Sequence, residues 1–173
     1  RGDGARGFPR RQSYGVGQRP YSLAAVDLDG DGWEDLITGN FISGDVSVLL
    51  ADGSGGYRPA THYATGDSPN LVDTGDLDGD GLVDIVVANC KSNAVSVLVN
   101  DGRGGFEVAT DVPTAPDTTG VAVVDIDGDP HLDLIVLSGV AARATLLAGG
   151  PGLTFTEVAH VPTGAGPCHF LFE

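Results

Sequence analysis

The strongest constraint on this chain is a nine-residue acidic segment that occurs three times, each copy 49 residues after the last. The copies cover residues 27–35, 76–84 and 125–133, and each has aspartates at its first, third, fifth and ninth positions. Self-similarity at a fixed period is the sequence signature of a repeat architecture. The chain is therefore expected to fold as a series of similar units.

Each unit also contains four short apolar segments separated by turn residues. In the second unit, residues 85–88 are continuously apolar, which is typical of a strand buried on both faces, while Val95, Val97 and Val99 alternate with other residues. No stretch shows convincing helical periodicity. Four strands in about 50 residues are typical of one β-propeller blade. The sequence predicts an all-β fold of four-stranded antiparallel meanders, with a parallel β-helix as the main structural alternative.

The phase of the repeat predicts the limits of the blades. Propeller rings close with about four to eight blades, and this chain holds only about 3.5. We therefore expect a partial propeller that belongs to a longer chain or is completed by further copies of itself. The expected order is the end of a preceding blade at residues 1–19, complete blades at 20–68, 69–117 and 118–166, and the first strand of a further blade at 167–173.

The charge of the chain excludes two classes of partner. Its formal net charge of −15 makes nucleic acid and anionic membrane surfaces unsuitable ligands, and 12 of its 24 acidic residues are the aspartates of the three loops. No apolar run reaches the roughly 18 residues of a membrane-spanning segment, so no membrane insertion is expected. Cys90 and Cys168 are the only cysteines, and the sequence leaves open whether they form a disulfide or remain two thiols.

The composition of the loops indicates a cage for a hard cation. In a tight loop the side chains at positions one, three and five turn toward one centre, small residues at four and six allow the sharp path, and position nine returns a carboxylate. Carboxylates about 4–5 Å apart repel each other by ~1 kcal/mol even in water. Oxygen ligands without Cys or His favour Ca²⁺ over softer metals, and Mg²⁺ would keep more water. Solvated acidic turns are the alternative.

Two departures from known patterns bear on these sites. An EF-hand loop needs a glutamate at position twelve, where this chain has Thr38, Val87 and Val136, so that class of calcium site is excluded. In the third loop Pro130 replaces the glycine at position six, and its fixed φ is incompatible with a left-handed conformation. We expect the third loop to bind Ca²⁺ more weakly or with altered geometry.

The motifs around the loops resemble a known repeat. The pattern Asp-x-Asp-Gly-Asp-Gly-x-x-Asp precedes an apolar strand, and the second unit continues with Ser-Asn-Ala-Val-Ser-Val-Leu at 92–98 and Asp-Gly-x-Gly-Gly-Phe at 101–106. This series resembles the FG-GAP or VCBS-type repeat, which also builds the seven-bladed propeller of integrin α subunits. The resemblance implies membership of such a ring and an extracellular or cell-surface location.

The resemblance further implies Ca²⁺ bound in the hairpin between the first two strands of each blade. The implied ligands are Asp27, Asp29, Asp31, the Trp33 carbonyl and Asp35 in the first loop, Asp76, Asp78, Asp80, the Leu82 carbonyl and Asp84 in the second, and Asp125, Asp127, Asp129, the His131 carbonyl and Asp133 in the third.

The sequence carries no sign of catalysis. It contains no nucleophile elbow, no phosphate-binding loop and no nucleophile with an evident base. The first hypothesis is a non-enzymatic, calcium-binding, secreted module that serves as a structural, adhesion or protein-interaction scaffold. The alternatives are a lectin with a glycan ligand, a self-assembling subunit of a filament or surface layer, and part of an enzyme whose catalytic residues lie elsewhere. Trp33 could stack on a sugar, although packing against a neighbouring blade is the favoured interpretation, and Arg1-Gly2-Asp3 is read as ordinary turn sequence.

Overall fold

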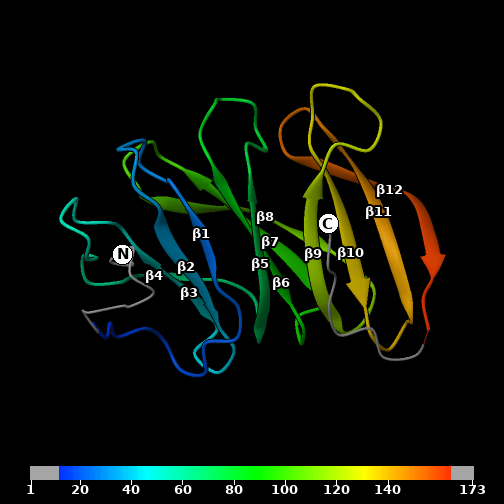
Figure 1. Ribbon diagram of the computed structural model, residues 1–173. Coiled ribbons are helices and arrows are strands. Elements are labelled where there is room, and N and C mark those ends of the chain that lie inside the picture. The colour runs from blue at the N-terminus through cyan, green and yellow to red at the C-terminus, as the bar shows by residue number, and fades with distance from the viewer. Residues whose placement is uncertain (1–11, 165–173) are drawn as a thin grey trace, which may run out of the picture.

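A computed structural model describes residues 12–164 of the chain. These residues form twelve β-strands and no helix, arranged in three four-stranded antiparallel sheets that stand side by side (Figure 1). In each sheet the strands lie in chain order, so every sheet is a meander. The predicted all-β fold is confirmed, and the β-helix alternative is wrong because each unit pairs its own four strands. The three sheets do not close a ring among the described residues, as expected of a partial propeller.

The strands recur with nearly the same bounds in each unit. The first sheet contains β1 (Ala24–Val26), β2 (Asp35–Asn40), β3 (Asp45–Leu49) and β4 (Thr61–Ala64). The second contains β5 (Pro69–Gly75), β6 (Asp84–Asn89), β7 (Ala94–Asn100) and β8 (Phe106–Pro113). The third contains β9 (Thr118–Val124), β10 (Asp133–Ser138), β11 (Arg143–Gly150) and β12 (Thr154–Pro162).

The sheets pack face to face through aliphatic side chains. Successive residues of a strand point to opposite faces of its sheet, and in β6 this alternation serves two cores. Ile85 and Val87 belong to the core shared with the first sheet, whereas Val86 and Ala88 belong to the core shared with the third sheet. All four residues are fully buried, as the continuously apolar sequence predicts. We call the face toward the next sheet the leading face and the face toward the preceding sheet the trailing face.

The hairpins between the second and third strands of each sheet share one conformational requirement. The residue before the third strand has a positive φ in all three units: 69° at Gly44, 52° at Asn93 and 47° at Ala142. Glycine and asparagine tolerate this left-handed region, whereas alanine is strained there by its Cβ. The recurrence shows that the same backbone turn is built in each unit.

Part of the predicted organisation lies outside the described residues. This applies to Arg1-Gly2-Asp3, to the strand expected at 167–173 and to Cys168. The other cysteine, Cys90, is a free thiol whose Sγ donates a hydrogen bond of 2.9 Å to Oδ1 of Asp117, and burial raises its pKa to about 11. Within residues 12–164 no helix is long and apolar enough to cross a membrane.

Candidate metal centres

An acidic loop joins the first two strands of each sheet, and the three loops lie at the edge that is uppermost in Figure 1. The last aspartate of each loop is also the first residue of the following strand: Asp35 begins β2, Asp84 begins β6 and Asp133 begins β10. Each loop is therefore anchored at its end in a buried central strand. Its other carboxylates are carried by the tight turn that precedes the strand.

The aspartate at position one closes the turn by accepting backbone N–H groups. Oδ1 of Asp27 accepts the N–H of Gly30 at 2.9 Å, and its Oδ2 accepts the N–H of Gly32 at 2.8 Å. Asp76 makes the same two hydrogen bonds in the second loop. Short acidic side chains stabilise turns in this way because they reach backbone groups a few residues ahead.

The third loop lacks one of these hydrogen bonds. Pro130 has no N–H to donate, and among the described contacts Asp125 accepts only the N–H of Gly128, at 2.7 Å. In the other loops the residue at position six has a φ of 83° (Gly32) or 89° (Gly81), which proline cannot adopt. The turn of the third loop is therefore held less tightly than the other two.

The aspartate at position nine ties its loop to a second turn. Asp35 is fully buried; its Oδ2 accepts the N–H of Leu28 at 2.9 Å and its Oδ1 accepts the N–H of Ala51 at 2.7 Å. Ala51 lies after β3, in the turn that leads to β4. The counterparts are Asp84 with Leu77 and Asn100, and Asp133 with Ile126 and Gly149. Each of these carboxylates thus fixes the acidic loop against the end of the third strand of its sheet, or against the residues just after that strand.

Burial raises the pKa of Asp35 and of Asp84 above the ordinary aspartate value. The backbone N–H groups that each carboxylate accepts oppose this shift, and the negative charges at positions three and five of the same loop add to it. Desolvation and like charges both disfavour the ionised form. A cation bound in the loop would favour the ionised form and so would lower the pKa of both carboxyl groups.

In each loop, carboxylates at positions one, three and nine come together. One ligand atom from each of the three side chains lies within 4.8 Å of the others, in the groups Asp27, Asp29 and Asp35, Asp76, Asp78 and Asp84, and Asp125, Asp127 and Asp133. These three groups could hold metal ions. The position-five aspartates Asp31, Asp80 and Asp129 are not part of them and instead accept the backbone N–H of Trp33, Leu82 and His131. The carbonyl groups of these three residues stay predicted ligands.

The sequence of the loops and strands matches one family model. The model, described as an FG-GAP-like repeat, matches residues 27–87 and again residues 76–136, which together span more than half of the chain. The chain belongs to the FG-GAP-like repeat family. This confirms the resemblance seen in the loop motifs. No curated protein matches the chain.

Solved structures share the fold of this FG-GAP-like chain. It is similar to BBS1N in a crystal structure with ARL6DN soaked with lead, at a TM-score of 0.59 and 15% identity over 90% of this chain and 46% of that chain. A crystal of the same complex soaked with mercury gives a TM-score of 0.57 and 17% identity over 90% and 48% of the two chains. The Tc holotoxin pore of Photorhabdus luminescens gives 0.50 and 22%, over 85% of this chain and 7% of that chain. The chain spans about half the length of the BBS1N chains, and these similarities establish the β-propeller fold alone.

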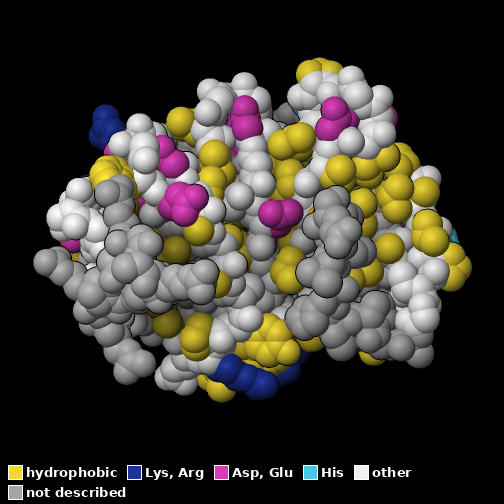
Figure 2. All heavy atoms as spheres, viewed as in Figure 1, with side chains coloured by type: hydrophobic (Ala, Val, Ile, Leu, Met, Phe, Trp, Pro, Cys, Tyr) yellow, Lys and Arg dark blue, Asp and Glu magenta, His cyan; other side chains and the backbone are white. Residues whose placement is uncertain are grey.

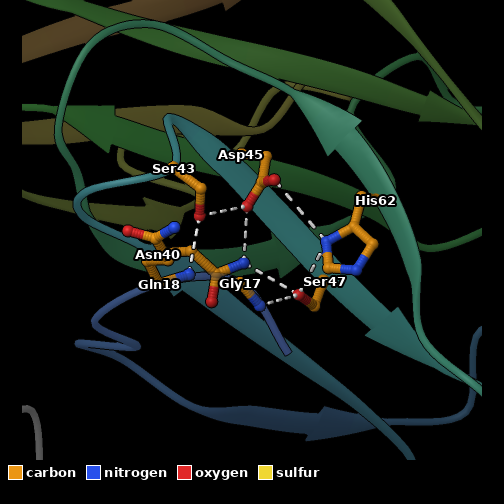
Figure 3. A network of polar contacts seen from close by, with 7 residues as sticks. All are labelled: Gly17, Gln18, Asn40, Ser43, Asp45, Ser47 and His62. Carbon is orange, nitrogen blue, oxygen red and sulfur yellow. Dashed lines mark hydrogen bonds and ion pairs between the residues drawn. The ribbon is translucent and has the colours of Figure 1, made fainter. Parts of the chain in front are cut away.

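A buried polar network recurs beside the central strands of the first two FG-GAP-like units. Oγ of Ser47 is fully buried, accepts the N–H of Gly17 at 3.1 Å and a side-chain N–H of Asn40 at 2.8 Å, and lies 3.2 Å from Nδ1 of His62 (Figure 3). Because this oxygen already accepts two N–H groups, the hydroxyl group of Ser47 can donate its hydrogen to Nδ1 of His62. The second unit repeats the arrangement with Ser96, Gly66, Asn89 and Asp111.

This network is no hydrolase triad, although it contains a serine, a histidine and an aspartate. Oγ of Ser47 and Oδ2 of Asp45 approach the same ring nitrogen, Nδ1 of His62, at 3.2 and 3.5 Å. A catalytic histidine uses one nitrogen for the nucleophile and the other for the carboxylate. Ser47 is also inaccessible to a substrate. The network instead ties the segment before the first strand to the interior of its sheet.

Two linked replacements alter this network in the third unit. Ala115 replaces Gly66 of the second unit, and Ser138 replaces Asn89. A Cβ on Gly66 would come closest to Oγ of Ser92 and would lie 2.8 Å from Cγ of Asn89, so these two side chains together require a glycine beside them. The shorter Ser138 leaves room for a methyl group, and its Oγ donates to the carbonyl of Ala115 at 3.4 Å.

Sequence reasoning missed this network and the second role of the position-nine aspartates. The signal for the network was present, because Asn40 and Asn89 are 49 residues apart, as are Ser47 and Ser96. The N–H partners of Asp35 could not be found in this way, since a backbone donor leaves no residue type to recognise.

The donor set of the three acidic groups fits a hard divalent cation. Each group offers carboxylate oxygens alone, which are the ligands that Ca²⁺ prefers. One carboxylate of each group is buried, and the pKa of two of these, Asp35 and Asp84, is raised. Bound Ca²⁺ would supply the positive charge that this buried group lacks.

Proposed function

We propose that this chain is a calcium-binding FG-GAP-like scaffold module, in which Ca²⁺ stabilises the first hairpin of each blade. The observation that carries the proposal is the repeated position-nine aspartate. It joins the acidic loop to a neighbouring turn and contributes an oxygen to the carboxylate group. Asp27 and Asp29 complete this group in the first loop, and the same positions do so in the other two.

The role proposed for Ca²⁺ is structural. Three carboxylates gathered within 4.8 Å repel one another, and a cation that binds only the folded loop stabilises the fold by mass action. Family membership and the propeller fold support a structural or protein-interaction module, and we propose no enzymatic activity for these residues. An extracellular or surface location agrees with the high Ca²⁺ concentration that modest loop sites require.

A Ca²⁺ titration tests this role. We expect Ca²⁺ to bind with a stoichiometry of two to three per chain by isothermal titration calorimetry and to raise the melting temperature reversibly against chelator. Asp27→Ala and Asp76→Ala should each remove about one equivalent. If chelator leaves the melting curve of the wild-type protein unchanged, the structural role is wrong.

The leading face of the third sheet supports a further proposal, that this face is covered by another blade. It carries Ile126, Ile135, Leu146 and Val161, of which Ile126 is 42% and Val161 is 55% exposed. Apolar side chains gather over this part of the surface in Figure 2. The residues 49 positions earlier, Leu77, Val86, Val97 and Val112, lie at most 8% exposed in the core with the third sheet.

The partner proposed for this face is the trailing face of a blade of the same kind, from the remainder of the same propeller or from a further copy of the chain. Exposed contiguous apolar surface of this sort marks an interaction site. Sedimentation of the 173-residue chain across concentrations tests the second source. Self-association that Val161→Ser weakens would support copies as partners, and a monomer at every concentration would contradict them.

A further inference from the structure

Asn100, the last residue of β7, joins the first two acidic loops through its buried side chain. Its side-chain N–H groups donate to the carbonyl of Leu28 at 2.8 Å and to the carbonyl of Val83 at 2.9 Å. Its Oδ1 accepts the N–H of Gly102 at 2.9 Å. The amide thus uses both of its donors, and one of them crosses from the second sheet to the loop of the first.

In the first loop this bridge ends between proposed calcium ligands. Leu28 stands between Asp27 and Asp29 in the sequence. The carbonyl that Asn100 holds is therefore part of the backbone that carries both carboxylates. The N–H of Leu28 is in turn accepted by Asp35, the third member of the same carboxylate group. The Leu28 side chain is buried in the core between the first two sheets, which fixes the residue from another side.

In the second loop the bridge starts beside the buried ligand. Val83, whose carbonyl accepts the other side-chain N–H of Asn100, directly precedes Asp84. Oδ1 of Asp84 accepts the backbone N–H of Asn100 at 3.0 Å. One residue therefore holds the ligand of the second loop with its backbone and the backbone of the first loop with its side chain.

The other two units cannot form this bridge. Ala51 and Gly149 stand 49 residues before and after Asn100. Both donate their backbone N–H to the position-nine aspartate of their own loop, but neither has a side-chain donor. A Cβ on Gly149 would also overlap the carbonyl oxygen of Leu132, the counterpart of Val83. The bridge is therefore specific to the first and second loops.

Ca²⁺ in one of these two loops would order backbone that the other loop also uses. A cation fixes its carboxylates, and the ordering of the loop that carries them costs free energy and lowers the affinity. Where a first cation already holds the shared backbone through Asn100, a second cation has less to order. Such coupling is reciprocal, so each site raises the affinity of the other by the same factor.

We propose that Asn100 couples the first two calcium sites, so that they bind Ca²⁺ with positive cooperativity while the third site binds independently. The inference rests on the proposed function, because it concerns the regulation of the same sites. Asn100 is a positioning residue, since it holds the two loops and is not one of the proposed ligands. Cooperative binding narrows the range of Ca²⁺ concentration over which the first two blades become fixed to each other.

The occupancy of the first loop can be followed separately from the others. Trp33 is the only tryptophan of the chain and stands at position seven of this loop. The probe is Tb³⁺, which takes oxygen ligands as Ca²⁺ does and emits light when a nearby excited tryptophan transfers energy to it. Tb³⁺ emission after tryptophan excitation therefore reports binding to the first site. Calorimetry with Ca²⁺ on the same variants counts the sites.

The second site is disabled with Asp78→Ala, which removes a proposed ligand but keeps Asp84 and Asn100. With Asn100 in place, we expect this change to raise the Tb³⁺ midpoint of the first loop about fivefold or more, the lower end of usual coupling factors. In Asn100→Ala the same change should shift the midpoint less than about twofold, the limit within which independent sites are additive. The lost charge of Asp78 acts in both backgrounds, so the difference between the two shifts measures the bridge.

Three further variants separate the bridge from a general loss of packing. Asn100→Gly carries the residue of the third unit, should abolish the coupling as well, and replaces Asn100→Ala if that protein does not fold. Asn70→Ala removes another side-chain N–H that crosses between sheets, donated at 3.1 Å to the carbonyl of Thr119, and should leave the coupling unchanged. Asp127→Ala disables the third site and should leave the Tb³⁺ midpoint of the first loop within about twofold.

Two results would overturn this inference alone. One is a shift by Asp78→Ala that is absent, or that is equal with and without the Asn100 side chain. The other is coupling lost equally in Asn70→Ala, which would reduce the effect to packing between sheets. In both cases Ca²⁺ bound in the calorimeter would leave the proposed function intact. Absence of any bound Ca²⁺ would overturn the proposed function, and this inference with it.

Discussion

At the scale of single residues, the aspartate at position nine is buried, whereas the other aspartates of the same loop are half-buried or exposed. Asp84 accepts the N–H of Leu77 at 2.9 Å and the N–H of Asn100 at 3.0 Å, one with each carboxylate oxygen. An asparagine at this position would turn its amide group toward one of these donors. A buried donor left without an acceptor costs roughly 1–3 kcal/mol.

We therefore predict that Asp84→Asn lowers the free energy of unfolding by about 1–3 kcal/mol even without Ca²⁺. Urea unfolding in chelator measures this loss separately from metal binding. The matched control is Asp80→Asn in the same loop, which removes an exposed carboxylate and should change stability by less than about 0.5 kcal/mol. Equal effects of the two substitutions on the free energy of unfolding would show that the buried hydrogen bonds of Asp84 add no stability.

The raised pKa values of Asp35 and Asp84 predict an unusual pH dependence of the metal-free protein. The folded state binds protons at these groups more tightly than the unfolded chain, where aspartate titrates near about 3.9. Their contribution to the free energy of unfolding therefore rises as the pH falls through the raised folded pKa, and levels off near pH ~3.9.

With saturating Ca²⁺ the same protonation competes with the metal, so stability should fall across that window. Urea unfolding over a pH series, with chelator and with Ca²⁺, measures the difference between the two states. Groups outside the three carboxylate groups, such as Asp52 with its lowered pKa, contribute to both curves and cancel. Parallel curves would contradict the prediction.

At the scale of elements, the loops show how far sequence reasoning reached. The four-aspartate spacing predicted carboxylates gathered around one point, and positions one, three and nine do gather. The position-five side chains lie outside these groups, where Asp31 accepts the backbone N–H of Trp33, and their role as ligands stays a prediction. Spacing alone cannot decide between a ligand and a turn-forming hydrogen bond when the same oxygen can serve both.

Pro130 provides a test at this scale. Pro130→Gly restores an N–H donor opposite Asp125 and permits the positive φ found at Gly32 and Gly81. We predict that Ca²⁺ binds the third loop of this variant more tightly, with a gain of up to about tenfold for one hydrogen bond to a charged group. Calorimetry resolves the weakest site. The reverse change, Gly81→Pro, should weaken the second site, and unchanged affinities in both variants would show that position six does not matter.

At the scale of the whole molecule, the period of 49 residues together with the four apolar segments of each unit was sufficient to predict an all-β propeller arrangement. The continuously apolar residues 85–88 predicted a strand buried on both faces, and Val86 and Val87 are indeed buried in different cores. The seven-bladed ring stays a prediction.

The central sheet should be the most stable part of the described residues. Both faces of β6 are buried between neighbouring sheets, whereas Ile135 of β10 is only half-buried on the leading side. Local opening is rarer where more apolar surface is covered. We predict that the amides of β6 exchange with deuterium more slowly than those of β10, as measured by native-state hydrogen exchange. Slower exchange in β10 would indicate that its leading face is already covered.

The pairing of Gly66 with Asn89, and of Ala115 with Ser138, limits how this chain can be recombined. A protein engineer who moves one unit into the place of another must transfer both members of the pair, although they lie 23 residues apart. Asn89 transplanted alone into the third unit would meet the methyl group of Ala115. Units with similar acidic loops therefore cannot be exchanged one at a time, because the residue pairs that pack beside their central strands differ.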